Sequence, residues 1–72
     1  MNNCINIGKN LKKIRENKGF SLLSIGRFID KSEEDIKNFE LGILPIPSDI
    51  LEILSILYNC SIEKILETNI TE

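Results

Sequence analysis

The sequence predicts an all-α fold of five short helices. Apolar residues recur three and four positions apart, at the spacing of one face of a helix, and no run alternates in the manner of a strand. Residues that end helices or form turns divide the chain into five pieces, and they are Gly19, Asp30, Gly42, Pro45, Pro47 and Asn59. The length of 72 residues is that of one domain. Residues 1–72 are therefore expected to form a single domain, with its core in about 6–66 and a polar tail in 67–72.

The first two helices are expected at 5–18 and 21–29. The first has an apolar face formed by Ile7, Leu11 and Ile14. Lysines cover its other side, and Gly19 follows it directly, as expected of a glycine that ends a helix. The hydroxyl of Ser21 is suited to cap the second helix, because it can accept a hydrogen bond from a free backbone N–H.

The third helix is expected at 32–41, after a short turn at Asp30 and Lys31. Ser32 is its predicted N-cap. Its first turn carries three acids, where the helix dipole favours negative charge, and these are Glu33, Glu34 and Asp35. The second and third helices, joined by the short turn, are expected to form a helix-turn-helix unit.

The last two helices are expected at 48–58 and from 61 onward, after an apolar loop with two prolines at 43–47. Ser48 is the predicted N-cap of the fourth helix. In the fifth helix three apolar side chains are expected to point inward, and they are Ile62, Ile65 and Leu66.

The composition argues against catalytic and metal chemistry. The chain has no histidine, which is the usual general base and the commonest metal ligand. Cys4 and Cys60 stand far apart, without a CxxC pair. The sequence holds no nucleophile–base pair and no glycine-rich phosphate loop. We therefore expect no enzyme activity, no metal and no cofactor.

No apolar run reaches the roughly 18 residues of a membrane helix, and residues 1–9 lack the apolar core of a signal peptide. The chain is therefore expected in the cytoplasm, with no membrane contact. Both thiols are then expected to be reduced and to act as small apolar groups, and a disulfide between them is the alternative.

The charges are unevenly distributed, although the net charge is only −2. Residues 1–31 hold seven cations and two acids, whereas residues 32–72 hold two cations and nine acids. The lysines of the first helix are either a solvated face or a surface that attracts a phosphate backbone or the acidic half of a second copy.

A set of residues spread over 6–66 resembles the pattern of one known family. Its members are Ile7-Gly8, Leu11, Ile14-Arg15, Lys18-Gly19, Ser21, Ile25, Ile29, Ser32, Ile36, Glu40, Gly42, Pro47-Ser48, Leu51, Leu54 and Asn59-Cys60-Ser61. At these spacings the chain resembles the phage-repressor type of helix-turn-helix domain, the Cro/CI-like or XRE family. The resemblance implies a lambda-repressor-like bundle of five helices, frequent dimers and DNA-binding regulation, with the third helix in the major groove.

The resemblance also implies roles for particular residues. The DNA-binding residues of the third helix would be Ser32, Glu33, Glu34, Asp35, Lys37 and Asn38. Candidates for contacts with the DNA backbone are Lys9, Arg27 and Lys31. Arg15 and Glu40 match the positions of an ion pair that ties the first helix to the third, which is a structural role.

The chain departs from the family at several contact positions. Leu22 stands where the family often has a phosphate-binding glutamine, and the loop at 43–46 is apolar where Lys or Arg is usual. One acid can read a base through cytosine N4, but three acids beside phosphates are mostly repelled, because cations supply most of the affinity. Lys31 replaces a buried aliphatic residue, so its ammonium group is expected to reach water.

Apolar residues are also more numerous than a domain of this length can bury. Those predicted to form a protein interface are Leu22, Leu23, Phe28, Ile43, Leu44, Ile46, Ile53 and Ile56. The alternative is that some of them pack locally and the rest are isolated aliphatic residues on the surface.

Two functions are therefore predicted. The first is a DNA-binding transcriptional regulator that acts as a homodimer through its third helix. The second is a module that keeps the fold but has lost ordinary DNA binding. It would recognise a basic protein partner through an acidic and apolar face, in the manner of an antitoxin or anti-repressor.

Overall fold

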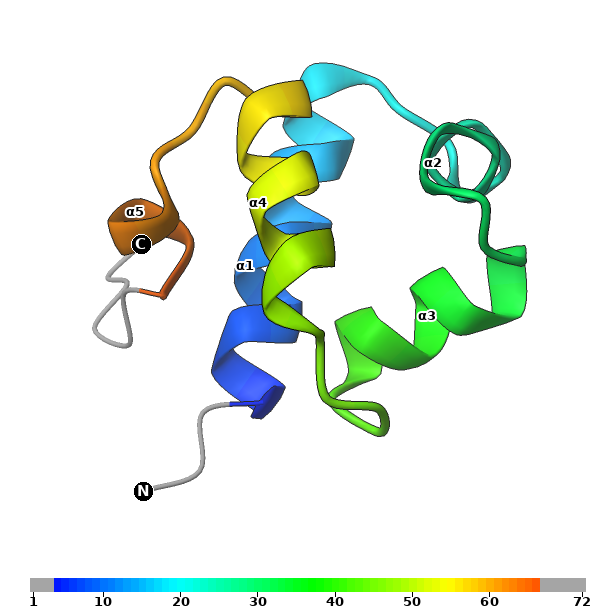
Figure 1. The fold of residues 1–72 in the computed structure, drawn as a ribbon, viewed down its shortest axis with the longest axis horizontal. Coiled ribbons are helices and arrows are strands. Elements are labelled where there is room, and N and C mark those ends of the chain that lie inside the picture. Colours follow the sequence, from blue (N-terminus) through cyan, green and yellow to red (C-terminus); the bar gives the residue numbers. More distant parts are fainter. Residues whose placement is uncertain (1–3, 67–72) are drawn as a thin grey trace.

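The computed structural model describes residues 4–66, which form five α-helices and no strand (Figure 1). The helices are α1 (Cys4–Lys18), α2 (Leu22–Ile29), α3 (Glu33–Leu41), α4 (Ser48–Leu57) and α5 (Ile62–Leu66). Figure 1 shows α5 on one side of α1, and α2 and α3 on the other. The prediction of an all-α fold is confirmed, whereas the predicted tail at 67–72 and the prediction for the Cys4 side chain lie outside the described residues.

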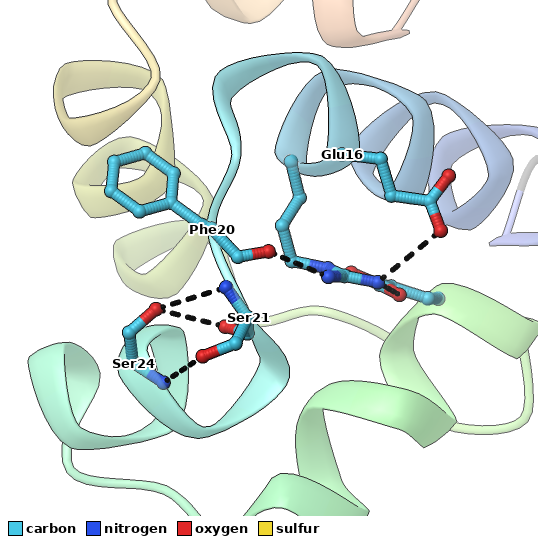
Figure 2. Close-up of polar contacts among 6 residues, drawn as sticks. Glu16, Phe20, Ser21 and Ser24 are labelled. Atoms are coloured by element: carbon cyan, nitrogen blue, oxygen red, sulfur yellow. Dashed lines mark hydrogen bonds and ion pairs between the residues drawn. The ribbon is translucent and has the colours of Figure 1, made fainter.

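The predicted C-terminus of the first helix and the predicted N-cap of the second are confirmed. Gly19 has a left-handed φ of 83°, which lets the N–H of Phe20 donate to the Arg15 carbonyl at 3.1 Å. Ser21 caps α2, because its hydroxyl accepts from the Ser24 N–H at 3.1 Å (Figure 2). The Ser24 hydroxyl in turn accepts from the Ser21 N–H at 3.2 Å, which completes a capping box.

The turn between α2 and α3 is tight. Ser32 caps α3 as predicted, and its hydroxyl accepts from the Asp35 N–H at 3.1 Å. Asp30 takes a left-handed φ of 61°, and the N–H of Lys31 donates to the Gly26 carbonyl at 2.7 Å. A Cβ at Gly26 would lie 2.5 Å from the Lys31 carbonyl oxygen, so this close approach requires glycine.

The predicted N-cap of the fourth helix is wrong by one residue. Pro47 occupies the N-cap of α4 in an extended conformation, and its carbonyl accepts from the Leu51 N–H at 3.0 Å. Ser48 is therefore already helical, and Pro47 has no side chain that can cap. The helix ends at Leu57 rather than Tyr58, within the usual uncertainty of a helix boundary.

The fifth helix follows the prediction at one end and departs from it at the other. The Ser61 hydroxyl accepts from the Lys64 N–H at 3.2 Å and so caps α5. Ile65 is fully buried and Ile62 half-buried, but Leu66 is 39% exposed. The inward position predicted for Leu66 is wrong. A helix of only five residues has room for one fully buried side chain, and in α5 this is Ile65.

All five helices contribute to one core. Its buried side chains are Leu11, Ile25, Ile29, Ile36, Phe39, Ile50, Leu54, Tyr58 and Ile65. None of the helices among residues 4–66 combines the length and the apolar character that crossing a bilayer requires. Cys60 is a half-buried free thiol that packs as a small group at the edge of the core.

The stability of this core depends on pH through Tyr58, the one tyrosine of the chain. Burial raises the pKa of its hydroxyl above the ordinary value near 10. In the unfolded chain the phenol loses its proton near pH 10, whereas in the folded protein it keeps it. Tyr58 therefore makes its full contribution to the free energy of unfolding below pH 10. Above that pH the free energy of unfolding falls, by at most about 1.4 kcal/mol per pH unit.

Urea unfolding of the wild type and of Tyr58→Phe, at neutral pH and above pH 10, tests this expectation. The wild type should lose more stability than the variant on going to high pH, because phenylalanine does not ionise. Equal losses in the two proteins would contradict a buried neutral phenol in the folded state.

Candidate functional site

Helix α3 is held tightly on its inner side. Ile36, Phe39 and Glu40 are buried there. Gly8 of α1 lies so close that an added Cβ would be 2.6 Å from the Phe39 carbonyl oxygen and closer still to that of Glu40. The absence of a side chain at Gly8 therefore lets the backbones of α1 and α3 touch.

A buried ion pair fastens α3 to α1, as the resemblance implied. The Arg15 Nε donates to Glu40 Oε2 at 2.6 Å, and Nη2 donates to Oε1 at 3.1 Å. The Arg15 Nη1 donates to the Phe20 carbonyl at 2.8 Å (Figure 2). The hydrogen bond to Glu40 raises the pKa of Arg15, so the guanidinium stays charged. Both side chains are less than a tenth exposed, and the two-point contact fixes the rotation of α3 about its axis.

The outer face of α3 holds the charged part of the predicted DNA-binding set. Glu33, Glu34 and Lys37 are exposed, and none of them forms an ion pair with another residue of 4–66. Asp35 and Asn38 are half-buried at the edges of this face. We call Glu33, Glu34, Lys37 and Asn38 the α3 face. The hydroxyl of Ser32 is already engaged in the N-cap.

The three predicted backbone-contact residues are exposed but lie in different places. Arg27 lies on the outer side of α2, where it lines a shallow hollow with Leu23 and Phe28. Lys31 lies in the turn before α3, and its exposure agrees with the predicted path of its ammonium to water. Lys9 lines a hollow along α1 with Lys13, and α3 does not contribute to that hollow. The structure therefore does not bring Lys9 together with the α3 face.

Six of the eight predicted interface residues are exposed, and they are Leu23, Phe28, Ile43, Leu44, Ile53 and Ile56. The most exposed of them is Ile56, at 79%. Leu22 and Ile46 instead pack against the core and are half-buried. Leu22 and Ile46 therefore pack locally, which was the alternative to their forming an interface. They do so because the α2 N-terminus and the proline loop fold back over the core.

Further apolar residues near α3 are exposed that were not predicted from the sequence. Leu41 is 54% exposed and Ile5 57% exposed. A Cβ at Gly42 would lie 2.8 Å from Ile5 Cγ1, so Ile5 packs on the glycine that separates Leu41 from Ile43. The spacing contained a signal for Leu41, because it lies four residues after Lys37 and therefore on the outer face.

The residues 4–66 hold no cluster of three side chains that could bind a metal ion. Comparisons of the chain with protein-family models, curated proteins and solved structures find no match.

Proposed function

We propose that this protein is a cytoplasmic DNA-binding regulator of the Cro/CI-like helix-turn-helix class that inserts α3 into the major groove. The observation that carries the proposal is the polar α3 face on a helix whose inner side is fixed by Gly8 and by Arg15. A helix held in this way can present side chains to base edges without first becoming ordered. The three-residue turn from α2 and the capped start of α3 support the same assignment.

The α3 face has suitable chemistry for reading bases. Lys37 can donate to guanine O6 and N7, and the Asn38 amide can pair with adenine N6 and N7. Glu33 or Glu34 can accept from cytosine N4. Because these acids also repel phosphates, Arg27 on α2 and Lys31 in the turn before α3 would supply the attraction to the backbone. Affinity is therefore expected to be modest and strongly dependent on salt.

A homodimer is part of the proposal. Ile53 and Ile56 are exposed one turn apart on α4, so they can form the apolar centre of a contact with a second copy. Two copies related by a two-fold axis would present two α3 helices to successive major grooves.

Titration of a labelled random-sequence duplex, followed by fluorescence anisotropy at about 20–50 mM salt, tests DNA binding. Lys37→Ala is expected to weaken binding and to reduce the slope of log K against log salt by about one. Lys12→Ala is the matched control, because it removes the same charge from an exposed position of α1 that belongs neither to the α3 face nor to the predicted DNA-contact residues. Absence of binding by the folded wild type, or equal losses in the two variants, would rule out reading by the α3 face.

A second candidate function is a protein-interaction module with a basic partner. The exposed side chains of Leu41, Ile43 and Leu44 at the end of α3 favour it, because they border a face with two free acids. Such a module would fail to bind the duplex. Reversing Glu33 and Glu34 to lysine would abolish its protein complex while leaving the fold intact.

A further inference from the structure

A groove runs along α1 on the side that faces α5. It consists of three hollows that share lining residues. The first is lined by Asn6, Lys9, Asn10 and Lys13. The second shares Asn10 and Lys13 and reaches Cys60 and Lys64, and the third continues past Asn17 to Lys18. We call these joined hollows the α1 groove.

The lining of the α1 groove is basic and rich in amides. Four lysines contribute to it, and they are Lys9, Lys13, Lys18 and Lys64. Among the described residues that line it there is no Asp or Glu. Lys9, Lys13 and Lys18 form no ion pair with any residue of 4–66. A chain with net charge −2 therefore concentrates positive charge in one groove.

The two walls of the groove, α1 and α5, are fixed to each other by a hydrogen bond. The buried Asn10 amide donates to the Ile65 carbonyl at 2.7 Å, which ties α5 to α1. The groove is therefore formed before any ligand arrives. Lys9 and Lys13 lie one turn apart, about 6 Å along the helix axis, so they can contact successive charges of an extended ligand.

The groove lies on the opposite side of α1 from α3. Gly8 and Arg15 face α3. At 3.6 residues per turn, Asn10 and Lys13 point away from that side. A ligand bound in the α1 groove would therefore not contact the α3 face. A proposal for the ligand of this groove does not depend on the proposed function.

The chemistry of the groove matches phosphate better than protein. Lysine and asparagine side chains are typical donors to the phosphate oxygens of nucleic acids. The centres of protein interfaces are instead enriched in aromatic residues and depleted in lysine. The one aromatic side chain at the groove, Tyr58, is 1% exposed and cannot stack on a base. Binding here would follow the backbone of a strand and ignore its sequence.

We propose that the α1 groove binds the phosphate backbone of a single nucleic-acid strand. Because stacking is absent, the affinity comes from the lysines and falls steeply with salt. Each lysine that contacts a phosphate of a single strand contributes about 0.7 to the slope of log K against log salt.

The test is a fluorescence-anisotropy titration of labelled oligothymidine with the full chain over a series of salt concentrations. Lys13→Gln is expected to reduce the slope by about 0.7, and the double variant Lys9→Gln/Lys13→Gln by about 1.4. Lys12→Gln is the matched control, because Lys12 is the exposed neighbour of Lys13 and does not line the groove. It is expected to bind as the wild type does.

Several outcomes would overturn the proposal. They are no binding of oligothymidine by the wild type, equal losses in Lys12→Gln and Lys13→Gln, and tighter binding of a polyglutamate peptide of equal charge than of oligothymidine. The variant Lys37→Ala separates this site from the α3 face. It should leave oligothymidine binding unchanged even if it weakens binding to the duplex, so failure of one proposal leaves the other standing.

Discussion

Replacing Glu40 by alanine is expected to lower the free energy of unfolding by about 3–5 kcal/mol. The change leaves the Arg15 guanidinium buried with the Phe20 carbonyl as its remaining strong partner. An uncompensated buried charge is far more costly than the loss of the ion pair alone. A domain of this length has roughly 4–11 kcal/mol of stability in total, so the variant should be largely unfolded at modest urea concentrations.

Chemical unfolding followed by circular dichroism measures the effect, and the chain offers two controls. Glu16 lies 3.9 Å from Arg15 Nη2 but is 58% exposed, so Glu16→Ala is expected to change stability by less than about 1 kcal/mol. The double variant Arg15→Met/Glu40→Leu removes both charges and should recover much of the loss. If Glu40→Ala lowered the free energy of unfolding as little as Glu16→Ala, the ion pair of Arg15 and Glu40 would not be what holds α3 to α1.

Replacing Gly8 by alanine should also destabilise the protein strongly, by about 3 kcal/mol. The new methyl group would collide with the Phe39 and Glu40 carbonyl oxygens, which are backbone atoms and cannot rotate away. The better helix propensity of alanine recovers only about 1 kcal/mol. To relieve the collision α3 must move away from α1, which also pulls on the contact between Arg15 and Glu40.

The same unfolding measurement tests Gly8→Ala, with Lys12→Ala as the control for helix propensity. Lys12 is exposed on the same helix, so its replacement should be neutral or slightly stabilising. A Gly8→Ala protein as stable as the wild type would mean that α1 and α3 can separate at little cost. In that case the α3 face would not be rigid.

Much of the fold was readable in the sequence, because its signals are local. Ser21, Ser32 and Gly19 act on backbone groups within a few residues, so their roles follow from order along the chain. The pair of Arg15 and Glu40 is not local, and the resemblance to a family supplied it. Ser48 misled the prediction because the proline before it already occupies the N-cap.

The surface was harder to predict than the helices. Leu22 and Ile46 have the same apolar character as Ile43 and Ile56, and only tertiary packing decides which of them face water. The α1 groove was also not predictable, since Lys13 lies on α1 and Lys64 lies 51 positions later on α5. The sequence showed an excess of lysine early in the chain, but only the fold shows which of those lysines line one groove.

The bond between Asn10 and the Ile65 carbonyl spans almost the whole chain, and this has a consequence for synthesis. A ribosome releases α1 before α5. Five residues are too few for a stable helix in water, so α5 forms only when Ile65 docks on the finished core. A nascent chain that already holds α1 to α4 therefore still lacks one wall of the α1 groove. The basic groove is completed only after α5 has left the ribosome.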